Sequence, residues 1–207
     1  AWRERKLLPV NWRVSIAVLT VLALQGGVGR FTVFDHNSPW SVAAHLGLAS
    51  ILLALVLSLV RLKSVPYHDW RRRAASNGCW SVAMLGGLVL TTMVSGAIVA
   101  KSGATLSCGE WPLCDGGLMP DLRDSGIVLH VVHRLLALIM VIGLLWGSWR
   151  WRQLRHLAAL AFVQVLLGAA VISIYSKHSA GFQVAIGAVH QIVAMIIFAA
   201  LVWSFWT

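Results

Sequence analysis

Three histidines in this sequence open the same short motif, H-x-x-x-A, and the motif is suited to binding a flat metal cofactor. The motifs run from His45 to Ala49, from His133 to Ala137 and from His190 to Ala194. Residues i and i+4 share one face of a helix, so each alanine leaves room beside the imidazole for a planar ligand. Two imidazoles at equal depth in different helices could approach one iron from opposite sides. The pattern therefore predicts a haem held by two histidines.

A packing role is the alternative for each histidine. A single histidine in an apolar helix can simply be a packed hydrogen-bonding group, but three at matching positions favour use as ligands, because histidine inside a membrane is costly. His130 competes with His133, since both lie on one helix face. We favour His133 because it aligns with the other two motifs. The remaining histidines are expected to be ordinary polar groups in loops or at helix ends: His36, His68, His156 and His178.

The segments that precede the histidine motifs also repeat. Two of them carry Q-x-x-x-G, from Gln25 to Gly29 and from Gln164 to Gly168. The third has Thr92 to Gly96 in the same place. Repeated patterns of this kind indicate repeated structural units, so we expect three similar helical hairpins.

Composition indicates that these hairpins cross a membrane. Of the 207 residues 58% are hydrophobic and 12% are charged, which is about half the charge usual in soluble domains. Runs of about 20 apolar residues can span a bilayer. Six such runs cover residues 14–33, 42–60, 80–100, 126–149, 157–176 and 182–206. The fold class predicted is all-α and integral to the membrane, a single domain over 1–207 with six transmembrane helices.

The distribution of charge predicts the orientation. The net charge of +10 could suggest nucleic-acid binding, but twelve of the 17 basic residues gather before 14–33, after 42–60 and after 126–149. These are alternate loops, the pattern of the positive-inside rule. Both termini are therefore expected on the cytoplasmic or matrix side, and loops 34–41, 101–125 and 177–181 on the outer side. No nucleic-acid partner is expected.

A small loop with two cysteines lies on the predicted outer side. Cys108 and Cys114 are six residues apart, in a compartment where disulfides persist. A structural disulfide and a redox-active dithiol both fit this spacing. The loop lacks C-x-x-C-H for haem attachment and has too few ligands for zinc. So short a ring would contribute only about 2 kcal/mol, which favours shaping the loop as its role. Cys79, near the inner face, is expected to be a reduced thiol.

Basic residues at the outer ends of the segments are candidates to pair with haem propionates. They are Arg30, Lys101, Arg134 and Lys177. Arginine pairs strongly and directionally with carboxylates, although such residues can also simply extend to the membrane interface. Arg134 is the best candidate because it adjoins His133.

The motifs together resemble one protein family. CGEWPLC from Cys108 to Cys114, HRLLA from His133 and HQIVA from His190 are similar to the haem A synthase family. The resemblance implies a membrane enzyme of eight helices in two four-helix halves, which oxidises a methyl group of haem o to the formyl group of haem A. Residues 80–207 resemble the complete C-terminal, haem b-binding half. Residues 14–60 resemble only the second hairpin of the N-terminal half.

The resemblance also implies roles for individual residues. Cys108 and Cys114 match the disulfide of the family, and His133 and His190 match its haem b ligands. His45 matches one of two histidines at the substrate haem, so haem o or haem A would bind near it. The first hairpin of the family has no counterpart here, nor has its histidine or its membrane-embedded glutamate.

Two functions are consistent with these residues. The leading one is a haem A synthase or a close relative, and the basic start at Ala1 suggests that the chain is part of an eight-helix enzyme. The alternative is a haem b electron-transfer or assembly subunit of a respiratory complex, without catalysis of its own. In either case we expect a multi-pass protein of the bacterial plasma (inner) membrane or the mitochondrial inner membrane. Haem and lipid are its expected partners, with haem o synthase, a respiratory oxidase, other membrane subunits or a second copy of the chain as further ones.

Overall fold

The computed structural model describes residues 9–62, 77–114, 117, 120–175 and 180–206. Its long helices are α1 (Pro9–Phe34), α2 (Pro39–Leu62), α4 (Asn77–Lys101), α5 (Ser125–Arg150), α6 (Arg155–Tyr175) and α7 (Ala180–Phe205). Two short 3₁₀ turns, η2 (Ala104–Leu106) and η3 (Arg152–Leu154), lie between them. All six long helices are long and apolar enough to cross a membrane. The prediction of six transmembrane helices is confirmed.

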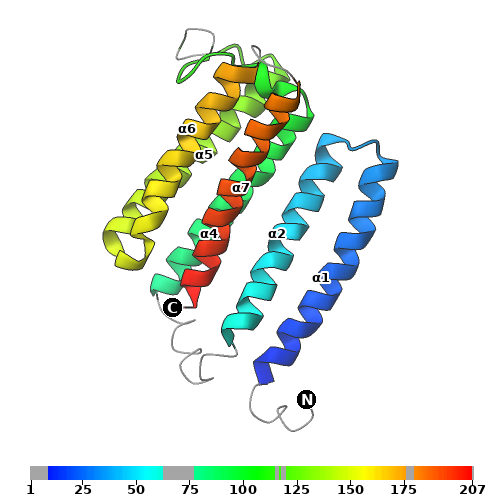
Figure 1. The fold of residues 1–207 in the computed structure, drawn as a ribbon, viewed down its shortest axis with the longest axis vertical. Coiled ribbons are helices and arrows are strands. Elements are labelled where there is room, and N and C mark those ends of the chain that lie inside the picture. The colour runs from blue at the N-terminus through cyan, green and yellow to red at the C-terminus, as the bar shows by residue number, and fades with distance from the viewer. Residues whose placement is uncertain (1–8, 63–76, 115–116, 118–119, 176–179, 207) are drawn as a thin grey trace.

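Four of the helices form a closed bundle, and the other two pack on its side. Around the bundle α4 contacts α5, α5 contacts α6, α6 contacts α7, and α7 returns to α4. Helix α2 packs against both α4 and α7, and α1 packs on α2 (Figure 1). Because α5 and α7 make no extensive contact within the described residues, they stand at opposite corners of the bundle. His133 and His190 come from these two helices.

Two connections at one end of the molecule are fixed by local hydrogen bonds. We call this end, where α1 joins α2 and α4 joins α5, the loop end, and the opposite end the terminal end. In the α1–α2 turn His36 and Asn37 adopt positive φ angles of 50° and 57°, the left-handed conformation common after a helix C-terminus. At the start of α5 the side chain of Asp124 accepts hydrogen bonds from the backbone N–H groups of Gly126 and Ile127, which is a standard N-cap.

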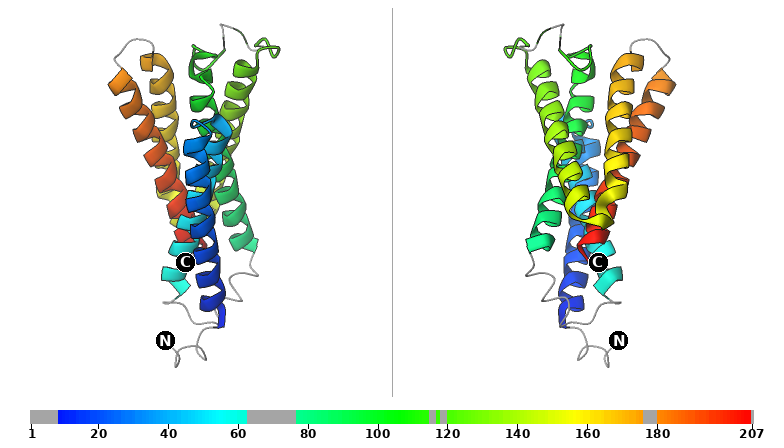
Figure 2. Two further views of the ribbon diagram at one scale, coloured as in Figure 1. Left: turned by 90° about the vertical axis from the view of Figure 1, so that its right-hand side faces the viewer. Right: turned by 90° about the vertical axis from the view of Figure 1, so that its left-hand side faces the viewer.

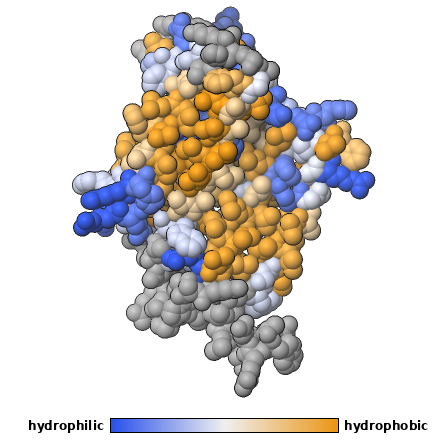
Figure 3. Space-filling model, in the orientation of Figure 1, coloured by the Kyte–Doolittle hydropathy of each residue, from blue (hydrophilic) through white to orange (hydrophobic). Residues whose placement is uncertain are grey.

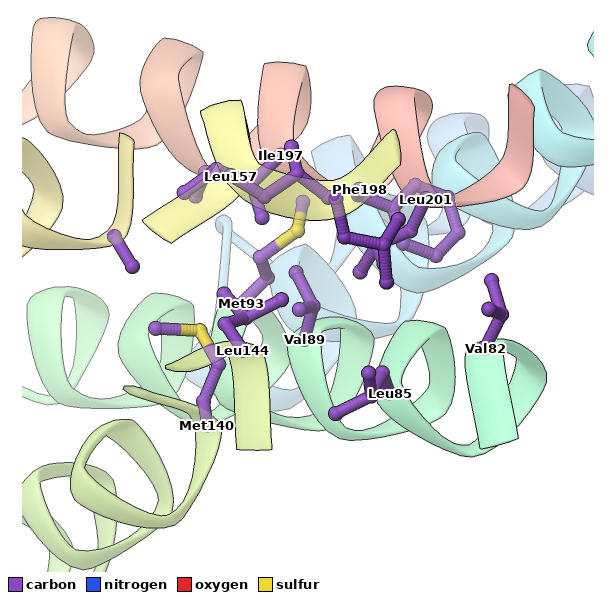
Figure 4. Packing of buried hydrophobic residues seen from close by; sticks show 13 residues of the cluster. Val82, Leu85, Val89, Met93, Met140, Leu144, Leu157, Ile197, Phe198 and Leu201 are labelled. Atoms are coloured by element: carbon purple, nitrogen blue, oxygen red, sulfur yellow. The ribbon is translucent and has the colours of Figure 1, made fainter. Parts of the chain in front are cut away.

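The larger of two hydrophobic clusters fills the terminal half of the four-helix bundle. Thirteen buried residues form it, among them Met93, Leu144, Ile197 and Leu201 (Figure 4). In every helix the members of this cluster lie between the level of the two histidines and the terminal end. The described helix pairs α4–α5 and α6–α7 approach each other at the terminal end and diverge toward the loop end (Figure 2). The packing thus closes one end of the bundle and leaves the other end wider.

The outer surface of the helices is apolar, as lipid contact requires. Large hydrophobic side chains such as Leu135, Leu138 and Ile142 are more than half exposed. Apolar surface extends across the middle of the molecule, and hydrophilic residues gather at its margins (Figure 3). A patch of this extent is not stable in water, so the surface is that of a membrane protein.

Candidate haem site

His133 lies against a glycine of the neighbouring helix. Its ring, on α5, is so close to Gly96 of α4 that a Cβ added to this glycine would lie 2.9 Å from the His133 Cε1 atom. Real side chains essentially never approach so closely, so only glycine leaves room for the imidazole here. The T-x-x-x-G motif of α4 therefore forms the wall behind the ring.

Ser95 fixes the orientation of the His133 ring. Its Oγ atom donates a hydrogen bond to the Thr92 carbonyl oxygen at 2.8 Å and lies 2.9 Å from His133 Nδ1. A carbonyl can only accept, so both contacts are satisfied when Nδ1–H of His133 donates to Oγ. Nε2 then carries a lone pair, and no described residue hydrogen bonds to it. This is the tautomer of a histidine that binds a metal through Nε2.

His190 repeats the glycine contact but not the serine contact. A Cβ added to Gly168 of α6 would lie 3.2 Å from His190 Cε1. The side-chain amide of Gln164, one turn earlier on α6, lies 3.2 Å from His190 Nε2. The Nδ1 atom of His190 is buried and has no hydrogen-bond partner.

The two rings lie at the level where the bundle core ends. Beyond them toward the loop end, none of residues 181–190 of α7 is buried, and Phe182, Val184 and Val189 are exposed. Two imidazoles, each set against a glycine and carried by helices at opposite corners of a bundle, fit a haem in a helical bundle.

His45 has the same surroundings in the α1–α2 hairpin. A Cβ added to Gly29 of α1 would lie 2.9 Å from His45 Cε1, and the Gln25 amide lies 3.2 Å from His45 Nε2. Helices α1 and α2 are outside the four-helix ring, so His45 does not join His133 and His190. Two of the three H-x-x-x-A motifs thus lie in the four-helix bundle, and the third lies on a helix outside it.

His130 is occupied by a different contact. Its side chain is only 4% exposed, and Nδ1 lies 3.0 Å from the Ala104 carbonyl oxygen in η2. The imidazole thereby joins α5 to the connection between α4 and α5. This contact favours His133 over His130 as the iron ligand.

Arg134 holds the cysteine loop, which is closed by a disulfide between Cys108 and Cys114. Its two terminal nitrogens donate four hydrogen bonds to backbone carbonyl oxygens, at 2.8 Å to Cys108 and Glu110, 2.9 Å to Leu113 and 3.3 Å to Pro112. Four bonds use all four N–H groups of these nitrogens. The Nε–H group is buried and unpartnered, so it is the one donor of this guanidinium that remains available.

The other basic candidates are less closely tied to the site. Arg30 is exposed on α1, and its guanidinium carbon lies 5.4 Å from the centre of the Phe34 ring. Lys177 is outside the described residues. Cys79 is buried in α4 and is not in a disulfide.

Sequence reasoning missed Ser95 and the contact of each glutamine with a histidine. Ser95 stands between Thr92 and Gly96 within a motif that the sequence does show, but its spacing to His133 gives no sign of contact. The Q-x-x-x-G motifs were visible as repeats. That their glutamines reach the imidazoles depends on how adjacent helices pack.

Comparison with known proteins gives a consistent result. The family model of the cytochrome oxidase assembly protein COX15-CtaA matches residues 1–202. A protein named heme A synthase from Alkalihalophilus pseudofirmus is 28% identical over 211 residues, which cover 97% of this chain and 70% of the relative. A heme A synthase of Shouchella clausii is 26% identical over 218 residues, with the same coverage of 97% and 70%. One from Halalkalibacterium halodurans is 28% identical over 209 residues, covering 94% of this chain and 65% of the relative. The chain belongs to the COX15-CtaA family of cytochrome oxidase assembly proteins, which includes the heme A synthases.

Proposed function

We propose that this chain binds a haem b between His133 and His190 and acts as a haem A synthase or a close relative. The observation that carries the proposal is the pair of imidazoles, each set against a glycine, on opposite corners of a bundle whose core stops at their level. Family membership supports the same reading.

Each residue of the site has a part in this proposal. His133 would bind the iron through Nε2, with its ring held by Ser95. His190 would supply the second imidazole. The Nε–H group of Arg134 would donate to a propionate, and Arg30 and Lys177 are further candidates for the carboxylates of bound haem. Haem, when bound, supplies the redox and oxygen chemistry, while the protein supplies ligation, orientation and exclusion of water.

His45 is the candidate for the substrate position. Its ring has the same glycine and glutamine neighbours as His190, so the hairpin could present an imidazole to a second haem. In the enzymatic reading haem o binds there, and its methyl group is oxidised to the formyl group of haem A. The haem b site would then relay electrons or organise the fold.

One observation favours a second function, a haem b electron-transfer or assembly subunit without catalysis. None of the six long helices contains an aspartate or a glutamate. An oxidation site built within these helices would therefore have no carboxylate for proton transfer. Two opposed histidines suffice for electron transfer.

Either function places the protein in an energy-conserving membrane. By the positive-inside rule the terminal end faces the cytoplasm or matrix, and the loop with Cys108 and Cys114 faces outward. The loop would cover the edge of the haem there.

The first experiment is a reduced-minus-oxidised spectrum and a pyridine haemochrome assay on the purified chain. We expect a b-type signal that is lost in His133→Ala and in His190→Ala and kept in the control His45→Ala, because His45 lies outside the four-helix bundle. Absence of haem from the wild-type chain, after haem is supplied during expression, would contradict the proposal.

A second measurement separates the two functions. Haem o is supplied to membranes containing the chain, and extracted haems are analysed by chromatography. Formation of haem A that disappears in His45→Ala supports the enzyme. Retention of haem b without haem A supports the electron-transfer subunit.

A further inference from the structure

We propose that Gln164 is a positioning residue that latches His190 in the haem-free protein and releases it when haem binds, so that His133 engages the haem first. This inference rests on the proposed haem b site between the two histidines. It concerns how the two ligands differ before haem arrives.

His133 is already prepared to bind iron. Its Nδ1–H group is committed to Ser95, whose hydroxyl proton is committed to the Thr92 carbonyl. The ring is thus held in one orientation, and its Nε2 lone pair has no partner among the described residues. Nothing has to be broken before this nitrogen binds a metal.

His190 is not prepared in the same way. The Gln164 side chain lies 3.2 Å from its Nε2 atom. As the amide is oriented, its N–H group donates to the Nε2 lone pair. If the amide were turned over, Nε2–H would instead donate to Oε1. In both arrangements Gln164 engages the atom that iron would need, and one nitrogen cannot serve both.

The side-chain amide of Gln164 makes only part of its possible hydrogen bonds, which favours its release from His190. Gln164 is only 7% exposed, and its Oε1 atom is buried without a hydrogen-bond partner. A buried polar atom without a partner is destabilising. Gln164 therefore holds His190 through one hydrogen bond and leaves its own Oε1 acceptor unsatisfied, so it competes weakly for the imidazole.

The same arrangement recurs where the sequence repeats. Gln25 contacts His45 Nε2 at the same distance of 3.2 Å, and its Oε1 atom is likewise buried and unpartnered. At His133 the corresponding residue is Thr92, whose hydroxyl donates to the Leu88 carbonyl of its own helix. Glutamine therefore contacts His45 and His190 but not His133. In the proposed haem b site, one ligand is held by a glutamine and the other is not.

The test compares haem loss from the full-length chain purified with its haem. Transfer of haem to apomyoglobin is followed by absorbance for the wild type, Gln164→Met and Ser95→Ala. Methionine has a similar length but cannot hydrogen bond in this way. We expect Gln164→Met to lose haem about 3- to 10-fold more slowly, the factor that corresponds to one neutral hydrogen bond. Because a thioether can itself bind haem iron, the slowing supports the latch only when Gln164→Leu shows it too. Ser95→Ala should lose haem faster, because His133 is no longer oriented.

Gln153→Met is the control, since it makes the same change at an exposed position of η3, away from the three motif histidines. It should leave haem b transfer unchanged. Gln164→Leu is a second apolar variant, and circular dichroism checks that each variant keeps its helices. Hemin titration of chain made without haem should show two spectral phases in the wild type, high-spin and then low-spin, and one phase in Gln164→Met.

The outcomes are distinguishable. If Gln164→Met and Gln164→Leu are folded and lose haem as fast as the wild type or faster, Gln164 is not a latch, although the haem site stands. If the wild-type chain holds no haem b, the proposed function fails instead.

Discussion

The glycine opposite each imidazole determines how the three histidines are placed. Added Cβ atoms would lie 2.9 Å from His45, 2.9 Å from His133 and 3.2 Å from His190. Small residues let membrane helices approach closely, and here the space is taken by a ring edge rather than by a second backbone. In each hairpin the first helix therefore has a glycine at one position, and the absent side chain leaves the space that the histidine ring of the second helix occupies.

Replacing Gly96 with alanine should displace His133. We expect Gly96→Ala to lose most of its haem b, and Gly168→Ala to lose less, because the added methyl group would be 3.2 Å rather than 2.9 Å from the ring. Haem content per chain, from the pyridine haemochrome assay, measures the effect. Gly87→Ala on the same helix is the control, since its Cβ would meet nothing within 4 Å. Equal haem content in Gly96→Ala and Gly87→Ala would refute the argument.

At the scale of elements, the start of α5 organises the whole connection from α4. Asp124 caps the helix, His130 bonds to η2, and Arg134 holds the disulfide-closed loop. Arg134 directly follows His133 in the sequence. The loop and the candidate iron ligand are thus attached to the same helical turn.

Arg134→Lys tests this attachment. Lysine keeps the positive charge but has three donors in place of a planar fork, so it cannot satisfy four carbonyls. Each hydrogen bond from a charged group contributes about 1.5–3 kcal/mol, so amide hydrogen exchange between residues 108 and 114 should be at least about tenfold faster. Mass spectrometry of peptides from this loop measures it.

The control is Arg123→Lys, because Arg123 is exposed. The double variant Cys108→Ser, Cys114→Ser provides a reference for an opened loop and should also retain haem less well. Unchanged exchange in Arg134→Lys together with lost haem would assign Arg134 to a propionate rather than to the loop.

At the scale of the whole molecule, the two ends of the bundle differ in how closely the helices pack (Figure 2). The terminal end holds the continuous core around Leu144 and Ile197, which keeps the four helices together. The loop end is wider and has a smaller buried cluster, of Cys108, Cys114 and Ile127 (Figure 2). The closed end therefore supplies most of the packing stability.

The orientation of the molecule is tested by labelling single cysteines from one side. Asp121→Cys at the loop end and Arg152→Cys at the terminal end are both at exposed positions. With a membrane-impermeant thiol reagent on intact cells, we expect Asp121→Cys to be labelled and Arg152→Cys to be labelled only after permeabilisation. The wild-type chain, with buried Cys79, is the control. The reverse pattern would contradict the positive-inside prediction.

The sequence by itself determined the number of helices and the motifs of the site. Apolar runs of bilayer length specify spanning helices because backbone polar groups in lipid must be satisfied within the segment. The repeats identified the three histidines, and the spacing of Cys108 and Cys114 allowed the ring that the structure closes. Each helix begins one to five residues before the predicted run, and α7 ends at Phe205, one residue before the predicted end.

The tertiary structure decided which of these residues meet. Only the packing of α4–α7 puts His133 and His190 on helices of one four-helix bundle and leaves His45 on a helix outside it. The packing also brings Arg134 within hydrogen-bond distance of the loop carbonyls and His130 within that distance of the Ala104 carbonyl. In the same way it brings Ser95 to His133 and Gln164 to His190. The physical reason is that a helix's own sequence fixes which residues share its face, whereas the neighbour that this face meets depends on how all the helices pack together.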